Sequence, residues 1–166
     1  YFSDVDQDRA LEAVVRLSRE TGMGLVLKEH PANRASMRQY RDRYRDEDLT
    51  WSDAHVHDLL RACAGVVTIN SGVGFEALLA GKPVVCLGRS EYDSTVFYSG
   101  VDDLGASWER ATAEPAEVRM QRYGRFVDWF LGRHAVDLAR PVASRYVLDR
   151  AIGRLVSDTL MRSVVE

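Results

Sequence analysis

The chain has 166 residues, of which 46% are hydrophobic and 28% charged, enough material for one folded core. Its formal net charge of −3 gives no basic field that would attract nucleic acid, and no apolar run reaches the ~18–20 residues that span a bilayer. The cysteines Cys63 and Cys86 have apolar neighbours, which favours free thiols in a reducing compartment over a disulfide framework. The chain opens with Tyr1 rather than Met, so we expect a single domain over residues 1–166 that is a piece of a longer polypeptide.

The first predicted element is a helix over about residues 6–20, in which apolar side chains recur at helical spacing. Asp4 or Asp6 can cap its amino end, and Gly22 ends it. A short strand is predicted next, over residues 24–28.

Pro31 closes this strand and forces an extended conformation on His30, so we expect His30 to project from the carboxyl end of the strand. The elements expected after it are an external, Arg-rich helix with little apolar face over residues 33–45, a short strand over residues 49–51 and a helix to about Cys63 that Ser52 or Asp53 caps.

The most informative stretch runs from Val66 to Gly88. It begins with β-branched apolar residues, the composition of a strand that is covered on both faces. A turn rich in Gly and Ser then separates this strand from a helix and a second buried strand. The predicted elements are a strand over residues 66–69, a helix over residues 75–80, a left-handed stop at Gly81 and a strand over residues 83–87.

Residues 89–114 contain several Gly and Ser breaks and are expected to form a long irregular excursion. Helices are predicted over residues 115–131 and from Pro141 onward. Because strands and helices alternate, we expect an α/β fold, a Rossmann-like, doubly wound domain built on one parallel sheet.

Polar residues follow the predicted strands at the points where the strands end. Lys28 and His30 follow one strand, and Asn70, Ser71 and Gly72 follow another. The carboxyl ends of parallel strands share one edge of a sheet, which is where open α/β sheets bind ligands. The Ser71 hydroxyl, the N–H groups of residues 72–74 and the His30 imidazole could together bind a phosphate, aided by the helix dipole.

Three further residues complete the candidate site. Gly74 keeps the turn uncrowded, Glu76 could accept hydrogen bonds from a ribose diol, and Tyr92 could line a sugar pocket. Each has a plainer alternative: Ser71 as a helix cap, Glu76 and Lys28 as solvated side chains, His30 as a strand terminator, and Tyr92 as core packing. His57 is expected to pack or cap rather than bind. No metal site is expected, because the acidic run at residues 46–48 is typical of a solvated surface.

Three segments carry a resemblance to a known family: Lys28-Glu29-His30-Pro31, His57-Asp58-Leu59-Leu60 and Asn70 through Val84. They resemble the capsular-polysaccharide (KpsC/KpsS-type) β-Kdo glycosyltransferases, over roughly residues 1–92. The resemblance implies the carboxyl-terminal, nucleotide-binding half of a GT-B enzyme that uses a CMP-sugar. It assigns His30 and Ser71 to the CMP phosphate and Glu76 to the ribose. Glu29 stands where that family often has Pro.

The resemblance further implies a CMP-Kdo donor, a glycolipid or polysaccharide acceptor, no separate cofactor, and an amino-terminal GT-B domain that carries the catalytic carboxylate. The expected location is the cytoplasm, with peripheral association at the inner face of the bacterial membrane left open. Two other hypotheses remain: a CDP-glycerol glycerophosphotransferase or UDP-sugar transferase or epimerase of GT-B fold, and a non-catalytic α/β binding module.

Overall fold

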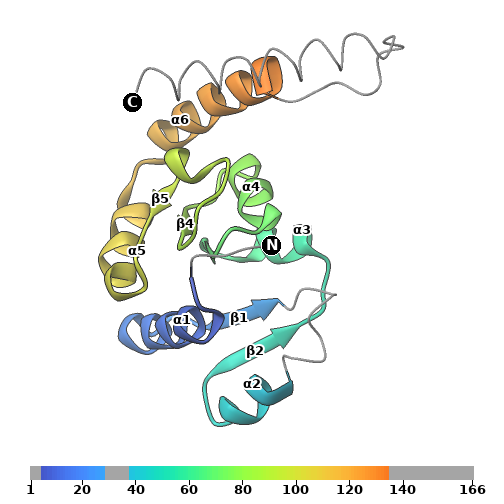
Figure 1. The fold of residues 1–166 in the computed structure, drawn as a ribbon, viewed down its shortest axis with the longest axis vertical. Helices are drawn as coiled ribbons and strands as arrows, with labels where there is room; N and C mark the ends of the chain where they lie inside the picture. Colours follow the sequence, from blue (N-terminus) through green and yellow to red (C-terminus); the bar gives the residue numbers. More distant parts are fainter. Residues whose placement is uncertain (1–4, 29–37, 135–166) are drawn as a thin grey trace, which may run out of the picture. The chain divides into compact units, whose positions relative to one another are not determined.

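The structure is a computed structural model that describes residues 5–28 and 38–134. The chain divides into two compact units, Tyr1–Phe126 and Val127–Glu166. The elements, shown in Figure 1, are α1 (Gln7–Thr21), β1 (Leu25–Lys28), α2 (Arg38–Arg43), β2 (Leu49–Ser52), α3 (Val56–Ala62), β3 (Val66–Thr68), α4 (Gly72–Leu79), β4 (Val84–Cys86), β5 (Phe97–Tyr98), α5 (Leu104–Ala113) and α6 (Ala116–Trp129), with 3-10 turns at Asp93–Thr95 and Val101–Asp103 and a π-helical segment at Phe130–His134.

All the described strands pair in parallel, which confirms the predicted Rossmann-like α/β class. They form two hydrogen-bonded sheets, β1–β2 and β3–β4–β5, rather than the one continuous sheet expected. The ladder of the second sheet continues one residue beyond the strands, because Gly88 N–H donates to Ile69 O at 2.8 Å. The carboxyl ends of β3 and β4 therefore lie at the same edge.

Helix α1 packs against both sheets, so its apolar side chains connect the two sheets although no backbone hydrogen bonds do. One side of it, with Ala13 and Leu17, belongs to a core cluster with Val85 and Leu87 from β4 and its end, together with Leu104 of α5. Another side, which includes Leu11 and Val15, packs with Tyr40 and Tyr44 and with apolar residues of β1 and β2.

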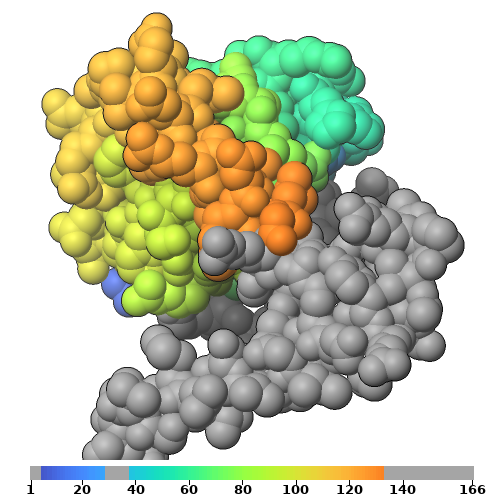
Figure 2. All heavy atoms as spheres, turned by 90° about the horizontal axis from the view of Figure 1, so that it is seen from above, coloured from blue at the N-terminus to red at the C-terminus, as the bar shows by residue number. Residues whose placement is uncertain are grey.

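Helices α4 and α5 lie on opposite sides of β4 in Figure 1, and both contact that strand. Helix α6 covers the junction between α4 and β4, where Arg119 Nε donates to Gly81 O at 2.9 Å and the Tyr123 hydroxyl donates to Lys82 O at 3.1 Å. In the space-filling view the light orange amino-terminal part of α6, which belongs to the first unit, lies beside the yellow segment that precedes it (Figure 2).

Several predicted helix ends are confirmed. Asp6 caps α1 by accepting a hydrogen bond from Asp8 N–H at 2.7 Å. Gly22 and Gly81 follow α1 and α4 in the left-handed region, with φ of 67° and 69°, where a side chain would be strained. Both cysteines are free, as expected.

Other expectations are wrong in detail. The Arg-rich segment has an apolar face, because Tyr40 and Tyr44 are 7% and 8% exposed. His55, and not Ser52 or Asp53, caps α3 by accepting from His57 N–H at 3.3 Å. The predicted helix from Pro141 lies outside the described residues.

The stretch from residue 89 to 114 is not an irregular excursion. It contains β5, which completes the second sheet, and the ten-residue helix α5. Leu104, Trp108 and Ala111 of α5 are buried at i, i+4 and i+7, the spacing of one helix face. Gly105, within the first turn of α5, obscures this pattern in the sequence. Within the described residues no helix is both long and apolar enough to cross a membrane.

Candidate functional site

The turn from β3 into α4 is built around Ser71. The Ser71 hydroxyl oxygen caps α4 by accepting a hydrogen bond from Val73 N–H at 3.2 Å. The Ser71 N–H donates to Thr68 Oγ1 at 3.2 Å, and Gly74 N–H donates to Ser71 O at 2.9 Å. Ser71 is thus a helix cap, yet its exposed hydroxyl still carries a hydrogen that it can donate to a ligand.

Tyr92 supports this turn from the inside. Its hydroxyl donates to Ser71 O, and its ring lies 6.4 Å from that of Phe75. Tyr92 is only 3% exposed. It therefore packs in the core, as the plainer of its two interpretations predicted, and does not face an open sugar pocket. Burial raises the pKa of Tyr92, so the hydroxyl, which is protonated at neutral pH, can go on donating in more alkaline solution than an exposed phenol.

The two glycines of the turn differ in their surroundings. A Cβ on Gly74 would clash with the Tyr92 side chain and lie 2.9 Å from Thr68 Cγ2, so only glycine allows the tyrosine to approach. A Cβ on Gly72 would meet nothing within 4 Å. Of the three N–H groups expected to face a phosphate, those of Val73 and Gly74 are already bonded, and among the described residues the Gly72 N–H has no acceptor.

The other predicted phosphate ligands are only partly placed. Asn70 is half-buried next to Ser71, and its side chain makes no hydrogen bond within the part of the chain that the structure describes. Lys28 ends β1 and its Nζ donates to Ala54 O at 2.7 Å, in the loop before α3. His30 lies outside the described residues, so its role at a phosphate stays a prediction.

Glu76, one turn into α4, faces His57 in the first turn of α3. His57 Nε2 and Glu76 Oε2 are 3.0 Å apart, and the two side chains are 60% and 39% exposed. They are 19 positions apart in the sequence, so no spacing pattern could have predicted the pair. Both line a groove of about 360 Å³ between the two helices, with Leu60, Arg61, Leu79, Ala80 and Lys82.

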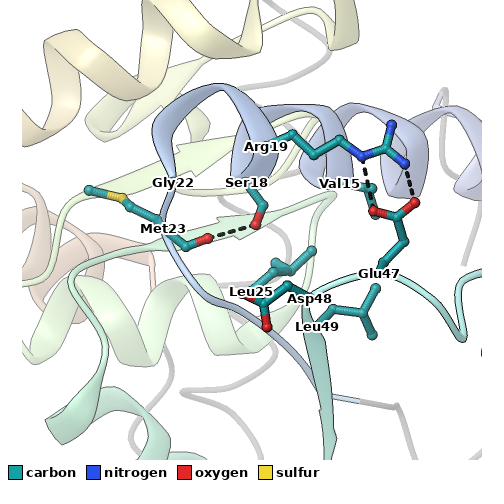
Figure 3. A pocket seen from close by; sticks show the side chains of 9 residues that line it. All are labelled: Val15, Ser18, Arg19, Gly22, Met23, Leu25, Glu47, Asp48 and Leu49. Atoms are coloured by element: carbon teal, nitrogen blue, oxygen red, sulfur yellow. Dashed lines mark hydrogen bonds and ion pairs between the residues drawn. The ribbon is translucent and has the colours of Figure 1, made fainter.

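A second, smaller hollow of about 180 Å³ lies at the amino ends of β1 and β2 (Figure 3). Polar residues that line it form hydrogen bonds with one another. The Arg19 guanidinium makes two hydrogen bonds to the Glu47 carboxylate, and the Ser18 hydroxyl donates to Met23 O at 2.6 Å. Arg19, Glu47 and Ser18 are thus already paired, and the hollow lies at the strand ends opposite to those where α/β sheets bind ligands.

Residues 5–28 and 38–134 contain no group of three or more His, Cys, Asp or Glu that could hold a metal ion. At the end of β4, Cys86 Sγ lies 2.9 Å from Ile69 O and 3.0 Å from Gly88 O, and burial raises the pKa of this thiol. Cys86 is therefore a structural thiol beneath the edge of the sheet, not an activated nucleophile.

Comparison with known proteins places this site in a family. The chain is 33% identical over 106 residues to the capsule polysaccharide modification protein LipB of Neisseria meningitidis, in a serogroup A strain and in a serogroup B strain. Each alignment covers 57% of this chain but only 24% of the relative, so the chain spans about a quarter of the length of these relatives. Residues 6–120, which include the β3–α4 turn and the α3–α4 groove, match the family described as capsule polysaccharide biosynthesis protein. Because this match covers well over half of the chain, the chain belongs to the capsule polysaccharide biosynthesis protein family.

Proposed function

We propose that this chain is the nucleotide-binding part of a glycosyltransferase of capsule synthesis that uses a CMP-sugar, with CMP-Kdo as the expected donor. The observation that carries the proposal is the exposed amino end of α4, where the Ser71 hydroxyl and the unbonded Gly72 N–H stand at the end of a parallel strand. Membership of a capsule biosynthesis family supports a carbohydrate reaction.

The chemistry of the leaving group fits a site of this kind. When a CMP-sugar transfers its sugar, negative charge develops on the phosphate of the departing CMP. Fixed hydrogen-bond donors and a helix dipole stabilise such a charge without a metal ion. The Ser71 hydroxyl and the Gly72 N–H would supply two donors, and we propose the His30 imidazole as a third.

The position of Glu76 suits the ribose of the same nucleotide. Glu76 lies four residues beyond Gly72, which corresponds to about 6 Å along the axis of α4. A nucleotide whose phosphate binds at the end of the helix can therefore place its ribose hydroxyls beside the Glu76 carboxylate. In this arrangement the turn holds the phosphate and the α3–α4 groove holds the nucleoside.

We propose that other parts of a longer protein bind the acceptor and supply the catalytic carboxylate. The acceptor, a glycolipid or polysaccharide, and the catalytic carboxylate are assigned to an amino-terminal GT-B domain. The proposed place of action is the cytoplasm, at the inner face of the membrane. A CDP-glycerol glycerophosphotransferase or a UDP-sugar enzyme would use the same turn for a diphosphate.

A thermal-shift panel with CMP, CDP and UDP tests the proposal. CMP should raise the melting temperature of the chain, and Ser71→Ala should weaken CMP binding by about 1–3 kcal/mol, the cost of losing one partner of a charged hydrogen bond. A larger shift with CDP or UDP would replace the donor, and no shift with any nucleotide would leave a non-catalytic module.

A further inference from the structure

We infer that His57 is a positioning residue that holds the Glu76 carboxylate for the ribose and so makes the site prefer a ribonucleotide to a 2′-deoxyribonucleotide. The inference rests on the proposed function, which it deepens. It starts from the 3.0 Å contact between His57 Nε2 and Glu76 Oε2. Because a carboxylate only accepts hydrogen bonds, Nε2 carries the hydrogen.

His57 is itself held in place. Its backbone N–H donates to His55 Nδ1 at 3.3 Å, and the two imidazole rings meet edge to face with centroids 4.9 Å apart. His57 thus extends from a capped first turn of α3. A glutamate side chain has several freely rotating bonds, and a fixed partner limits this freedom before a ligand arrives.

The charged neighbours in the groove do not compete for this carboxylate. Arg61 pairs with Asp58 at 3.0 Å, and Lys82 Nζ donates to Cys63 O at 2.8 Å. Among the described residues, the ion pair recorded for Glu76 is the one with His57. With Oε2 bonded to His57, Oε1 remains to accept from a hydroxyl group in the groove.

A ribose diol supplies two such hydroxyl donors, and a 2′-deoxyribose supplies one. An ordered carboxylate distinguishes them more sharply than a mobile one, which can turn toward water at little cost. Exposure of both side chains argues against a mainly structural role, because exposed pairs contribute little to stability. The geometry therefore points to sugar discrimination as the use of this pair.

The test is the ratio of the affinities for CMP and 2′-deoxyCMP, measured by isothermal titration calorimetry on the full chain. The wild type should prefer CMP. His57→Leu removes the donor and should reduce this preference about fivefold, a part of what one charged hydrogen bond is worth. His57→Gln, whose amide can donate from a place close to Nε2, should restore most of it. The control is Arg19→Met, which removes an ion pair outside this groove and should leave the ratio unaltered.

The outcomes separate the two proposals. If the wild type binds neither nucleotide, the proposed function fails. If the wild type binds CMP but shows no ribose preference, the positioning role of His57 is wrong while nucleotide binding stands. The same holds if the ratio of the two affinities is unchanged in His57→Leu, whether or not both affinities fall.

Discussion

Two polar regions at the ends of the parallel sheets differ in whether their hydrogen-bonding groups are already paired. At the amino ends of β1 and β2, Arg19 and Glu47 satisfy each other. At the carboxyl end of β3, the Ser71 hydroxyl keeps its hydrogen and Gly72 keeps its N–H. The difference teaches that polar groups at a strand end indicate a binding site only where they are not already paired with one another.

The two sheets also differ in burial, and one substitution made in each should show it. Val85 of β4 is completely buried in the core cluster, whereas Val26 of β1 is 51% exposed. Val85→Ala should lower the free energy of unfolding by about 2–3 kcal/mol, because it removes buried methyl groups and leaves a cavity. Val26→Ala should cost far less, and urea unfolding that shows equal losses would contradict the comparison.

The two glycines of the β3–α4 turn provide a sharper test. Gly74→Ala forces a methyl group against Tyr92 and Thr68 and should destabilise the fold by about 1–3 kcal/mol. Gly72→Ala meets no neighbour and should leave the melting temperature nearly unchanged while it weakens CMP binding. A variant of Gly72 that binds CMP as tightly as the wild type would show that the open space is not used by the ligand.

Alkaline pH should lower the free energy of unfolding, because buried ionisable groups lie beneath the β3–α4 turn and beside β4. Burial raises the pKa values of Tyr92, Tyr123 and Cys86 in the folded state. Their contribution to stability is complete below the unfolded values, about 8.5 for a thiol and about 10 for a phenol, and is lost as the pH rises above them.

Denaturant unfolding between pH 7 and pH 11 measures this loss. Tyr92→Phe should cost about 1 kcal/mol at pH 7 through the lost bond to Ser71 O, and it should flatten part of the decline above pH 10. A decline that is equally steep in this variant would show that Tyr92 titrates as an exposed phenol.

The smallest effect is expected at the other hollow. Arg19→Met removes the pair with Glu47, but the arginine side chain is 63% exposed, so the melting temperature should not change measurably. The affinity for CMP should also stay the same. A loss of CMP binding in this variant would move the nucleotide site to the amino ends of β1 and β2.

Local patterns in the sequence were sufficient for much of the fold. The cap at Asp6, the left-handed stops at Gly22 and Gly81 and the strand–turn–helix around Ser71 follow from side-chain chemistry at fixed positions. Helix α5 was missed because Gly105 and a short apolar stripe resemble a loop, and β5 because it has only two residues.

Of the candidate site, only the turn between β3 and α4 could be predicted from the sequence. Ser71, Gly72 and Gly74 act within one segment, so their arrangement follows from local geometry. The support by Tyr92 and the pair of His57 with Glu76 depend on packing between residues that are 21 and 19 positions apart in the sequence. Such contacts depend on the tertiary packing of the helices against the sheet, which local patterns in a single sequence do not predict.

The central claim is that a nucleotide binds at the amino end of α4, and an NMR titration of the amide groups tests it most directly. On addition of CMP, the Gly72 amide signal should shift and saturate, while the Gly22 amide, beside the hollow at Arg19, should stay in place. A Gly72 signal that does not move, or a Gly22 signal that moves as far, would contradict the account.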